Sequence, residues 1–284
     1  MNWWCSARDV AWSWAWQPYP GVWLFVAALV GGYAGMLRRL APAHAPAGAP
    51  IVRPAQVAWY GYGTLALWIA SDWPVGTLGS GYLLSLHTVQ WILYALVAPP
   101  LLLLGVPAWA WRAFAGWPAV GPALRFLARP LPGLLLFYAT MLGTHLPRVV
   151  DVLRPWQLGS FAIDMAWLAG GLALWWPVIA PRPDLSRIRD LPAIGYLFAA
   201  TIVPTIPAAF MTFSAAPLYG LYELAPRVAG IPALQDQRTA GLLMKAVGDP
   251  ILWLAMSVIF FRWARTEQEA DRREREARRA ARAG

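Results

Sequence analysis

Long apolar runs separated by short polar or proline-rich connections recur along the whole chain. A helix that crosses a bilayer needs about 20 mostly apolar residues, and seven runs approach that length. They lie at 21–37, 56–70, 82–104, 131–146, 161–179, 191–213 and 239–263. The pattern therefore predicts an all-α fold, a polytopic membrane bundle of about seven transmembrane helices.

The third run, within SLHTVQWILYALVAPPLLLLGVP at residues 85–107, is the most informative. His87 stands near its start, and Trp91 follows four residues later on the same helical face. Pro99 and Pro100 lack backbone N–H groups and should kink or locally break the helix. An ionisable side chain in hydrocarbon is costly and usually faces the protein interior or water, which makes His87 a candidate functional residue.

The two ends of the chain differ from the apolar runs. Residues 1–20 hold five tryptophans together with Arg8 and Asp9, which favours an interfacial segment over a span. Residues 265–284 alternate acidic residues with arginine, which is typical of a solvated helix. We therefore divide the chain into an interfacial segment (1–20), a seven-span membrane domain (21–264) and a charged cytoplasmic tail (265–284).

Basic residues predict the orientation, because cytoplasmic connections are enriched in arginine and lysine. Arginines gather after the first, third, fifth and seventh runs. They are Arg38, Arg39 and Arg53, then Arg112, Arg125 and Arg129, then Arg182, Arg187 and Arg189, and finally eight arginines beginning at Arg262. This places the N-terminus outside and the C-terminus in the cytoplasm, in agreement with an odd number of crossings.

Composition narrows the function further. The chain is 59% hydrophobic and 13% charged, with a mean hydropathy of +0.47. The net charge of +9 resides largely in the connections and the tail, so it does not indicate a nucleic-acid partner. A single cysteine, Cys5, excludes an internal disulfide and a Cys-x-x-Cys motif. The sequence contains no nucleophile elbow or P-loop, and we expect no enzymatic activity.

Polar residues from different runs should meet at one end of the bundle. Under the predicted topology, one set falls in the outer leaflet or on the outer surface: Asp72, His87, His145, Asp151, Asp164, Asp236 and Gln237. The sequence thus predicts a polar site at the outer mouth of the bundle.

His87 and His145, with Met141 one turn before His145, could bind a metal such as copper, because imidazole and thioether suit it. Asp164, Asp236 and Gln237 would be outer-face neighbours of that metal. The alternative is that each histidine hydrogen-bonds a neighbouring helix and fixes packing.

Two charged residues inside the runs need partners. Asp164 could pair with Arg148, Arg154 or His145, or with a metal. Lys245 is the only lysine. It has Asp249 four residues on, which favours an ion pair over a retinal Schiff base. The inner halves of the runs are almost wholly apolar and show no internal repeat, which argues against a transporter.

Four stretches together resemble the CtaG family of membrane cytochrome c oxidase (caa-type) assembly factors. They are SDWPVGTLGSGYLLSLHTVQW…VAPPLLLLGVP (71–107), THLPRVVDV (144–152) with GGLALWWPV ending at 178, MTFSAAPLYGLY (211–222), and LQDQRTAGLLM (234–244). The resemblance implies a multi-pass assembly factor in the bacterial inner (cytoplasmic) membrane. Its expected partners are haem-copper oxidase subunits and the lipid bilayer, and it would support transient copper delivery or subunit maturation at the outer face.

The chain departs from the family pattern at the positions that would supply further ligands. His87, His145, Pro147, Asp151, Asp236 and Gln237 match the pattern, but Trp91, Ser160 and Asp164 stand where family members carry histidine. A tryptophan cannot replace an imidazole as a metal ligand. The departure keeps a second hypothesis open, in which the chain is a metal-free accessory or structural subunit of a respiratory membrane complex.

Overall fold

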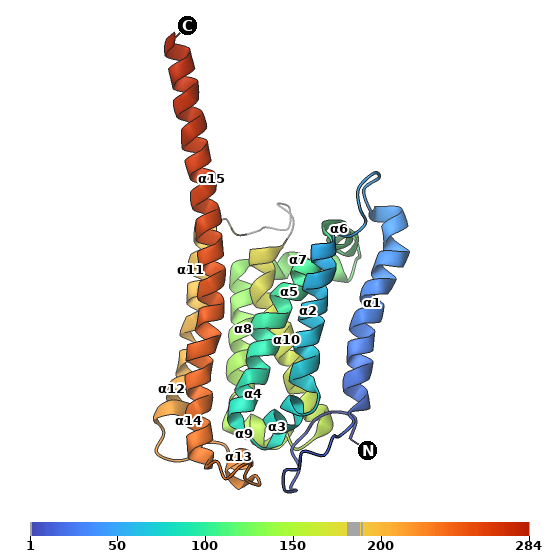
Figure 1. Cartoon of the computed structure of the whole chain (residues 1–284), viewed down its shortest axis with the longest axis vertical. Helices are drawn as coiled ribbons and strands as arrows, with labels where there is room; N and C mark the ends of the chain where they lie inside the picture. Colours follow the sequence, from blue (N-terminus) through green and yellow to red (C-terminus); the bar gives the residue numbers. More distant parts are fainter. Residues whose placement is uncertain (1, 181–187, 189, 284) are drawn as a thin grey trace.

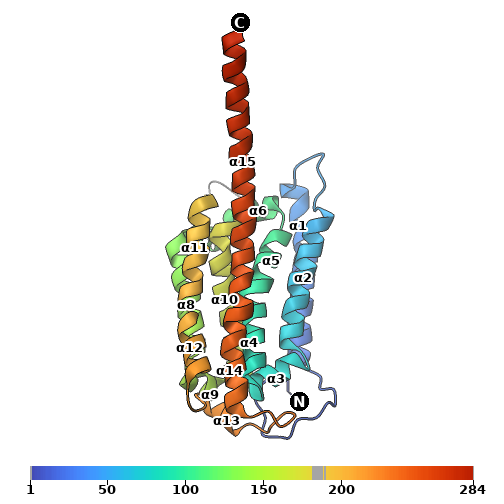
Figure 2. The same cartoon turned by 60° about the vertical axis from the view of Figure 1, so that its left-hand side comes forward.

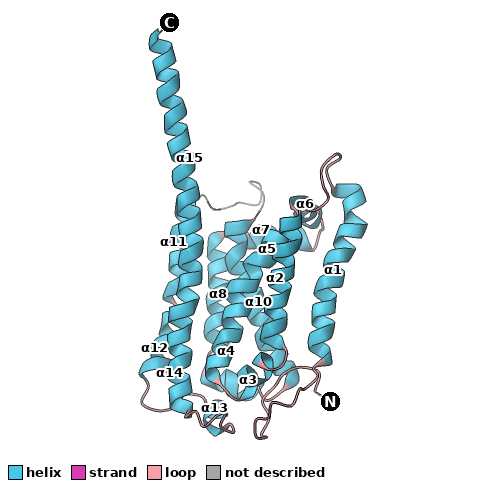
Figure 3. Ribbon diagram, viewed as in Figure 1, coloured by secondary structure: helices cyan, strands magenta, loops and turns pink. Residues whose placement is uncertain are grey.

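The computed structural model describes residues 2–180, 188 and 190–283, and its regular elements are all helical (Figures 1 and 3). Two of the elements, η1 and η3, are single π-helical turns inside longer helices. In chain order the elements are α1 (Pro20–His44), α2 (Pro54–Ser71), α3 (Val75–Gly81), α4 (Leu84–Trp91), η1 (Ile92–Val97), α5 (Ala98–Gly105), α6 (Ala108–Ala115), α7 (Val120–Leu127), α8 (Pro130–Thr144), α9 (Pro147–Leu153), α10 (Gln157–Ile179), α11 (Asp190–Ile202), α12 (Thr205–Phe213), α13 (Gly220–Leu224), α14 (Ala233–Leu243), η3 (Met244–Gly248) and α15 (Asp249–Ala283).

Five helical stretches are long and apolar enough to cross a membrane. A sixth is added if α7 and α8, bent by 90° at their junction, form one span. The α2 helix runs beside these stretches (Figure 1), but tyrosine, glycine and glutamine make it less apolar. The all-helical membrane bundle is therefore confirmed, whereas the count of seven spans stays a prediction.

The two termini lie at opposite ends of the bundle (Figures 1 and 2). The N-terminal end carries α3, α9, α13 and the start of α14. The opposite end, which we call the tail end, carries α6 and α7, and the last part of α15 projects beyond it. Of the arginines that predict the orientation, Arg182, Arg187 and Arg189 lie outside the described residues. Which end faces the cytoplasm remains a prediction.

The double proline of the third run widens its helix without interrupting it. Pro99 and Pro100 have no N–H to donate, and their rings would crowd the carbonyls four residues earlier. The preceding turn is the π turn η1, in which the N–H of Ala98 reaches back five residues to the carbonyl of Leu93. The stretch Leu84–Gly105 consequently remains one span. Pro250 likewise follows the π turn η3.

Several helices extend beyond the predicted apolar runs, because helix formation needs no apolar residues outside the bilayer. The first helix passes Arg38 and Arg39 and ends at His44, an exposed residue. The expected connection at 109–129 contains α6 and α7. The last run begins six residues early, at Ala233, and its charged tail is an exposed helix to the end of α15, as its pattern predicts.

Residues 2–19 are irregular and fold against the N-terminal end of the bundle. Trp4 and Tyr19 are buried there, whereas Trp14 and Trp16 are exposed. The indole Nε1 of Trp4 donates to Asp164 Oδ2 at 2.8 Å, and the amide of Ala7 donates to the carbonyl of Arg154 at 3.0 Å. The segment is therefore attached to α10 and to the end of α9 by its own polar groups.

Both intramembrane charges have partners. Asp164 pairs with Arg154, one of its three predicted protein partners, with 3.0 Å between Nη1 and Oδ1 and both side chains buried. The same Nη1 donates to Ser160 Oγ at 2.7 Å, and the guanidinium carbon lies 4.8 Å from the centroid of the Trp167 ring. Lys245 pairs with Asp249 at 2.5 Å, as their spacing predicts.

Replacing Arg154 by methionine should strongly destabilise the protein, because it leaves the Asp164 carboxylate buried without its counter-charge. We expect a loss of about 3–5 kcal/mol in the free energy of unfolding, measured as a lower thermal midpoint in detergent. Arg148→Met, in the short helix α9 that Arg154 directly follows, is the control, since Arg148 is exposed and its loss should change stability by less than about 0.5 kcal/mol. Equal midpoints for the two variants would contradict a structural role for the ion pair.

Candidate functional site

Two of the predicted site residues, His87 and His145, meet at the N-terminal end of the bundle. His87 lies in the first turn of α4, and His145 caps the C-terminus of α8. Their ring centroids are 5.8 Å apart, with an angle of 76° between the ring planes. Both side chains are buried, at 0% and 4% exposure. We call these two residues the histidine pair.

The tautomer of His145 follows from its hydrogen bond. Its Nδ1 lies 2.8 Å from the carbonyl oxygen of Met141. A carbonyl can only accept, so Nδ1 carries the hydrogen and Nε2 keeps a lone pair. Within the described part of the chain this Nε2 is buried and has no hydrogen-bond partner.

The tautomer of His87 follows from Tyr222 on α13. The Tyr222 hydroxyl lies 2.6 Å from the carbonyl oxygen of Gly79 and 2.9 Å from His87 Nδ1. Its one proton goes to the carbonyl, which cannot donate, and its oxygen therefore accepts from Nδ1–H of His87. Burial raises the pKa of Tyr222, so the phenol keeps that proton. Among the described residues, His87 Nε2 also lacks a partner.

Aromatic side chains enclose the histidine pair. The Trp167 ring centroid lies 4.9 Å from that of His87 and 6.0 Å from that of His145, and its Nε1 donates to Thr144 Oγ1 at 2.7 Å. Trp91 stacks edge-on against His145 at 5.7 Å. Trp91 therefore occupies a place beside the pair, but its indole offers no lone pair to a metal.

Asp236 and Gln237 also match the family pattern, and their side chains hold backbone groups of other elements in place. The Asp236 carboxylate accepts hydrogen bonds from the amides of Leu84 and Ser85 and from the Ser85 hydroxyl. It thereby caps the N-terminus of α4, where four amides have no partner within the helix. Gln237 accepts from the amide of Leu218 at 2.6 Å and donates to the carbonyl of Met211 at 3.3 Å.

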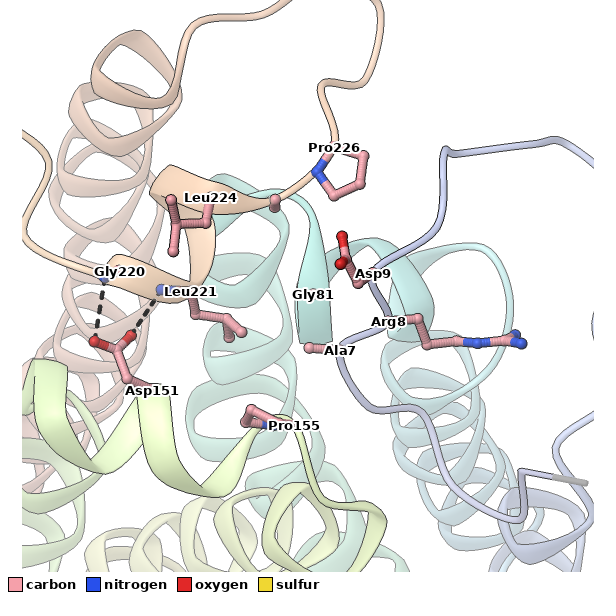
Figure 4. Close-up of a pocket in the computed structure, with 11 residues that line it drawn as sticks. Ala7, Arg8, Asp9, Gly81, Asp151, Pro155, Gly220, Leu221, Leu224 and Pro226 are labelled. Atoms are coloured by element: carbon pink, nitrogen blue, oxygen red, sulfur yellow. Dashed lines mark hydrogen bonds between the residues drawn. The ribbon is translucent and has the colours of Figure 1, made fainter.

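Asp151 holds the short helix that carries Tyr222. Its two carboxylate oxygens accept from the amides of Gly220 at 3.2 Å and Leu221 at 3.0 Å, at the start of α13 (Figure 4). The neighbouring Tyr219 donates its hydroxyl hydrogen to the carbonyl of His145 at 2.9 Å. The connection between α12 and α14 is thus bonded to both histidines.

A cavity of about 590 Å³ lies beside α13 (Figure 4). Its walls come from the N-terminal segment, the end of α3, α9 and α13, and include Gly81, Leu221 and Leu224. Gly81 is required there, because a Cβ at this position would lie 2.5 Å from the Cα of Ala7. The α13 helix therefore contributes both to the wall of this cavity and, through Tyr222, to the setting of His87.

The donors that could hold a metal are few. The described residues contain no group of three or more His, Cys, Asp or Glu side chains suited to a metal ion. Asp164 is committed to Arg154, and Asp236 to α4. Burial raises the pKa of Cys5, and its thiol donates to the carbonyl of Ser71. Two imidazole Nε2 atoms therefore remain, with the buried Met141 on α8 as the nearest thioether in sequence.

Several residues that set this geometry carry no signal in the sequence pattern. Tyr222, Tyr219, Ser85 and Trp167 are ordinary members of apolar or mixed segments. Tyr222 lies 135 positions from His87, so the bond between them could not be read from local spacing. The available indication was that Tyr219 and Tyr222 stand in MTFSAAPLYGLY (211–222), one of the stretches that carry the family resemblance.

Replacing Tyr222 by phenylalanine should release His87 from its single tautomer. The carbonyl of Gly79 loses its donor and His87 Nδ1–H loses its acceptor, at a cost of about 1–3 kcal/mol in the free energy of unfolding. The ¹⁵N chemical shifts of the His87 ring nitrogens should change from one tautomer to a mixture.

Tyr196→Phe is the matched control, because Tyr196 is also a buried tyrosine that donates to a carbonyl, that of Leu174 at 2.9 Å. It should lower stability by a similar amount and leave the His87 nitrogen shifts unchanged. A single unaltered tautomer in Tyr222→Phe would show that another group orients His87.

Comparisons with known proteins gave one result. The family model Caa3_CtaG, described as cytochrome c oxidase caa3 assembly factor, matches residues 31–266. No curated protein and no solved structure matches the chain.

Proposed function

The chain belongs to the family of cytochrome c oxidase caa3 assembly factors, and we propose that it serves oxidase maturation by holding copper between His87 and His145 on its way to an oxidase subunit. One observation carries the proposal. Both imidazoles are buried, both direct their Nδ1–H to protein oxygens, and both keep an unpartnered Nε2 within the described residues.

The hydrogen bonds on Nδ1 support a ligand role. Histidines that bind metals commonly donate their other ring N–H to a carbonyl or a similar acceptor, which fixes the ring and raises the basicity of the ligating nitrogen. Met141 and Tyr222 supply those acceptors here. A histidine that served only packing would gain more by bonding both of its ring nitrogens to neighbouring helices.

The surroundings favour monovalent copper. The pair lies between the rings of Trp91 and Trp167, and the nearby Asp164 is already neutralised by Arg154. A buried divalent ion without an anionic ligand carries a larger desolvation cost than a monovalent one. Imidazole suits copper, and Cu(I) accepts two-coordinate binding.

The place of the pair supports delivery at the outer face. The pair lies at the N-terminal end of the bundle, and the described clusters of basic connections lie at the tail end. With the N-terminus outside, as the basic residues indicate, copper would be held at the outer face of the membrane.

A second function has its own support. Trp91 provides no ligand, and no third His, Cys, Asp or Glu joins the pair in the described part of the chain. A metal-free accessory subunit that keeps this polar end only to bind its partner would have the same fold.

Copper binding separates the two functions. Purified protein loaded with Cu(I) under reducing conditions should retain about one equivalent, and His87→Ala with His145→Ala should retain none. His44→Ala is the control, because His44 is the third histidine and is exposed at the end of α1. Copper is measured by atomic absorption after gel filtration.

The same double variant should insert normally in cells and lower the copper content and activity of the oxidase. Wild-type protein without copper, together with normal oxidase copper in the double variant, would overturn the copper role and favour the accessory subunit.

A further inference from the structure

An apolar groove of about 660 Å³ lies among α5, α10 and α15, away from the histidine pair. All three helices belong to stretches long and apolar enough to span a membrane. Leu101 and Leu104 line it from α5, Trp175 from α10, and Leu254 and Val258 from α15.

The groove has the length of one leaflet. Along α15 its lining begins at Ile251 and ends at Arg262, eleven residues further on, a rise of about 16 Å along the helix axis. Half of a hydrocarbon core of about 30 Å is about 15 Å. A transmembrane helix of another protein would need a surface across both leaflets, so the groove fits a lipid chain better than a helix.

A cation marks the end of the groove. Arg262 is the first charged residue after Asp249 on α15, so it lies where the helix leaves the apolar layer at the tail end. Its side chain is 51% exposed, and Nη2 bonds to Asp190 Oδ1 at 2.5 Å. A guanidinium has five N–H donors, and its remaining donors can reach a phosphate at the level of the lipid headgroups.

We propose that this groove is a binding site for one phospholipid of the tail-end leaflet, with an acyl chain between α5 and α15 and the phosphate at Arg262. Arg265, one turn further along α15, adds a second positive charge at headgroup level and gives the site a preference for anionic lipids. The site is independent of copper.

Native mass spectrometry of the protein in mild detergent tests the site. Wild type equilibrated with equal amounts of phosphatidylglycerol and phosphatidylcholine should keep one tightly bound phosphatidylglycerol. Ala255→Trp fills the groove and should lose that lipid. Ala28→Trp is the control, because Ala28 is exposed on α1, outside the groove. Arg262→Gln should keep a lipid but lower the preference for phosphatidylglycerol by about fivefold.

A second measurement uses the unaltered protein, so it does not depend on a variant that folds. Phosphatidylglycerol with a photoreactive group in its acyl chain should crosslink mainly to residues 96–104 of the third span and 251–259 of α15. The proposal would be overturned if the lipid crosslinked equally to these stretches and to the exposed side of α1. Equal lipid retention by wild type and Ala255→Trp would also overturn it.

Discussion

The polar end of this bundle depends on the single proton of the Tyr222 hydroxyl. Because that proton is donated to the carbonyl of Gly79, the phenol oxygen must accept from His87, and the other imidazole nitrogen has no partner among the described residues. Tyr222 can do this only while α13 is held by Asp151, and His87 only while the start of α4 is held by Asp236. The availability of a lone pair at His87 is therefore decided by carboxylates on two other helices.

This arrangement explains why the end of the molecule is rich in acids and yet contains no acidic metal site in its described part. Asp151 and Asp236 neutralise helix N-termini, where free amides and the helix dipole favour negative charge. Asp164 neutralises Arg154. These carboxylates provide acceptors for backbone amides and a counter-charge for Arg154, groups that are costly to leave unpaired away from water. The imidazoles of His87 and His145 are the groups at this end that keep a nitrogen lone pair for a ligand.

Sequence reasoning could predict the fold class, most helices and the meeting of His87 with His145. Long apolar runs indicate helices that lie in lipid. Once these helices are placed across the membrane in alternating directions, residues at the same depth, such as His87 and His145, are expected at the same end of the bundle. The π turn before Pro99 could not be predicted, because kinked, broken and widened helices all accommodate a proline. The early start of α14 was hidden by Asp236 and Gln237, which look solvated in a sequence and are in fact bonded to α4 and to the loop before α13.

The site itself was predictable only in part. The choice of Arg154 among three candidate partners for Asp164 depends on packing of α9 against α10, and the role of Tyr222 depends on a contact across 135 positions. Neither contact follows from the spacing of residues along the chain. Residue types indicated which groups needed partners, and the structure was required to show which partners they have.

The last helical stretch connects the two ends of the molecule mechanically. From Ala233 to Arg282 it is continuous over 50 residues, a rod of about 75 Å. One end bears the carboxylate that caps α4, and the other projects beyond the bundle as an arginine-rich arm. The π turn at Met244–Gly248, followed by Pro250, departs from the α-helical hydrogen-bond pattern within this rod. Through this single helical stretch, the arginine-rich arm at the tail end is covalently continuous with the residue that caps α4, the helix whose first turn holds His87.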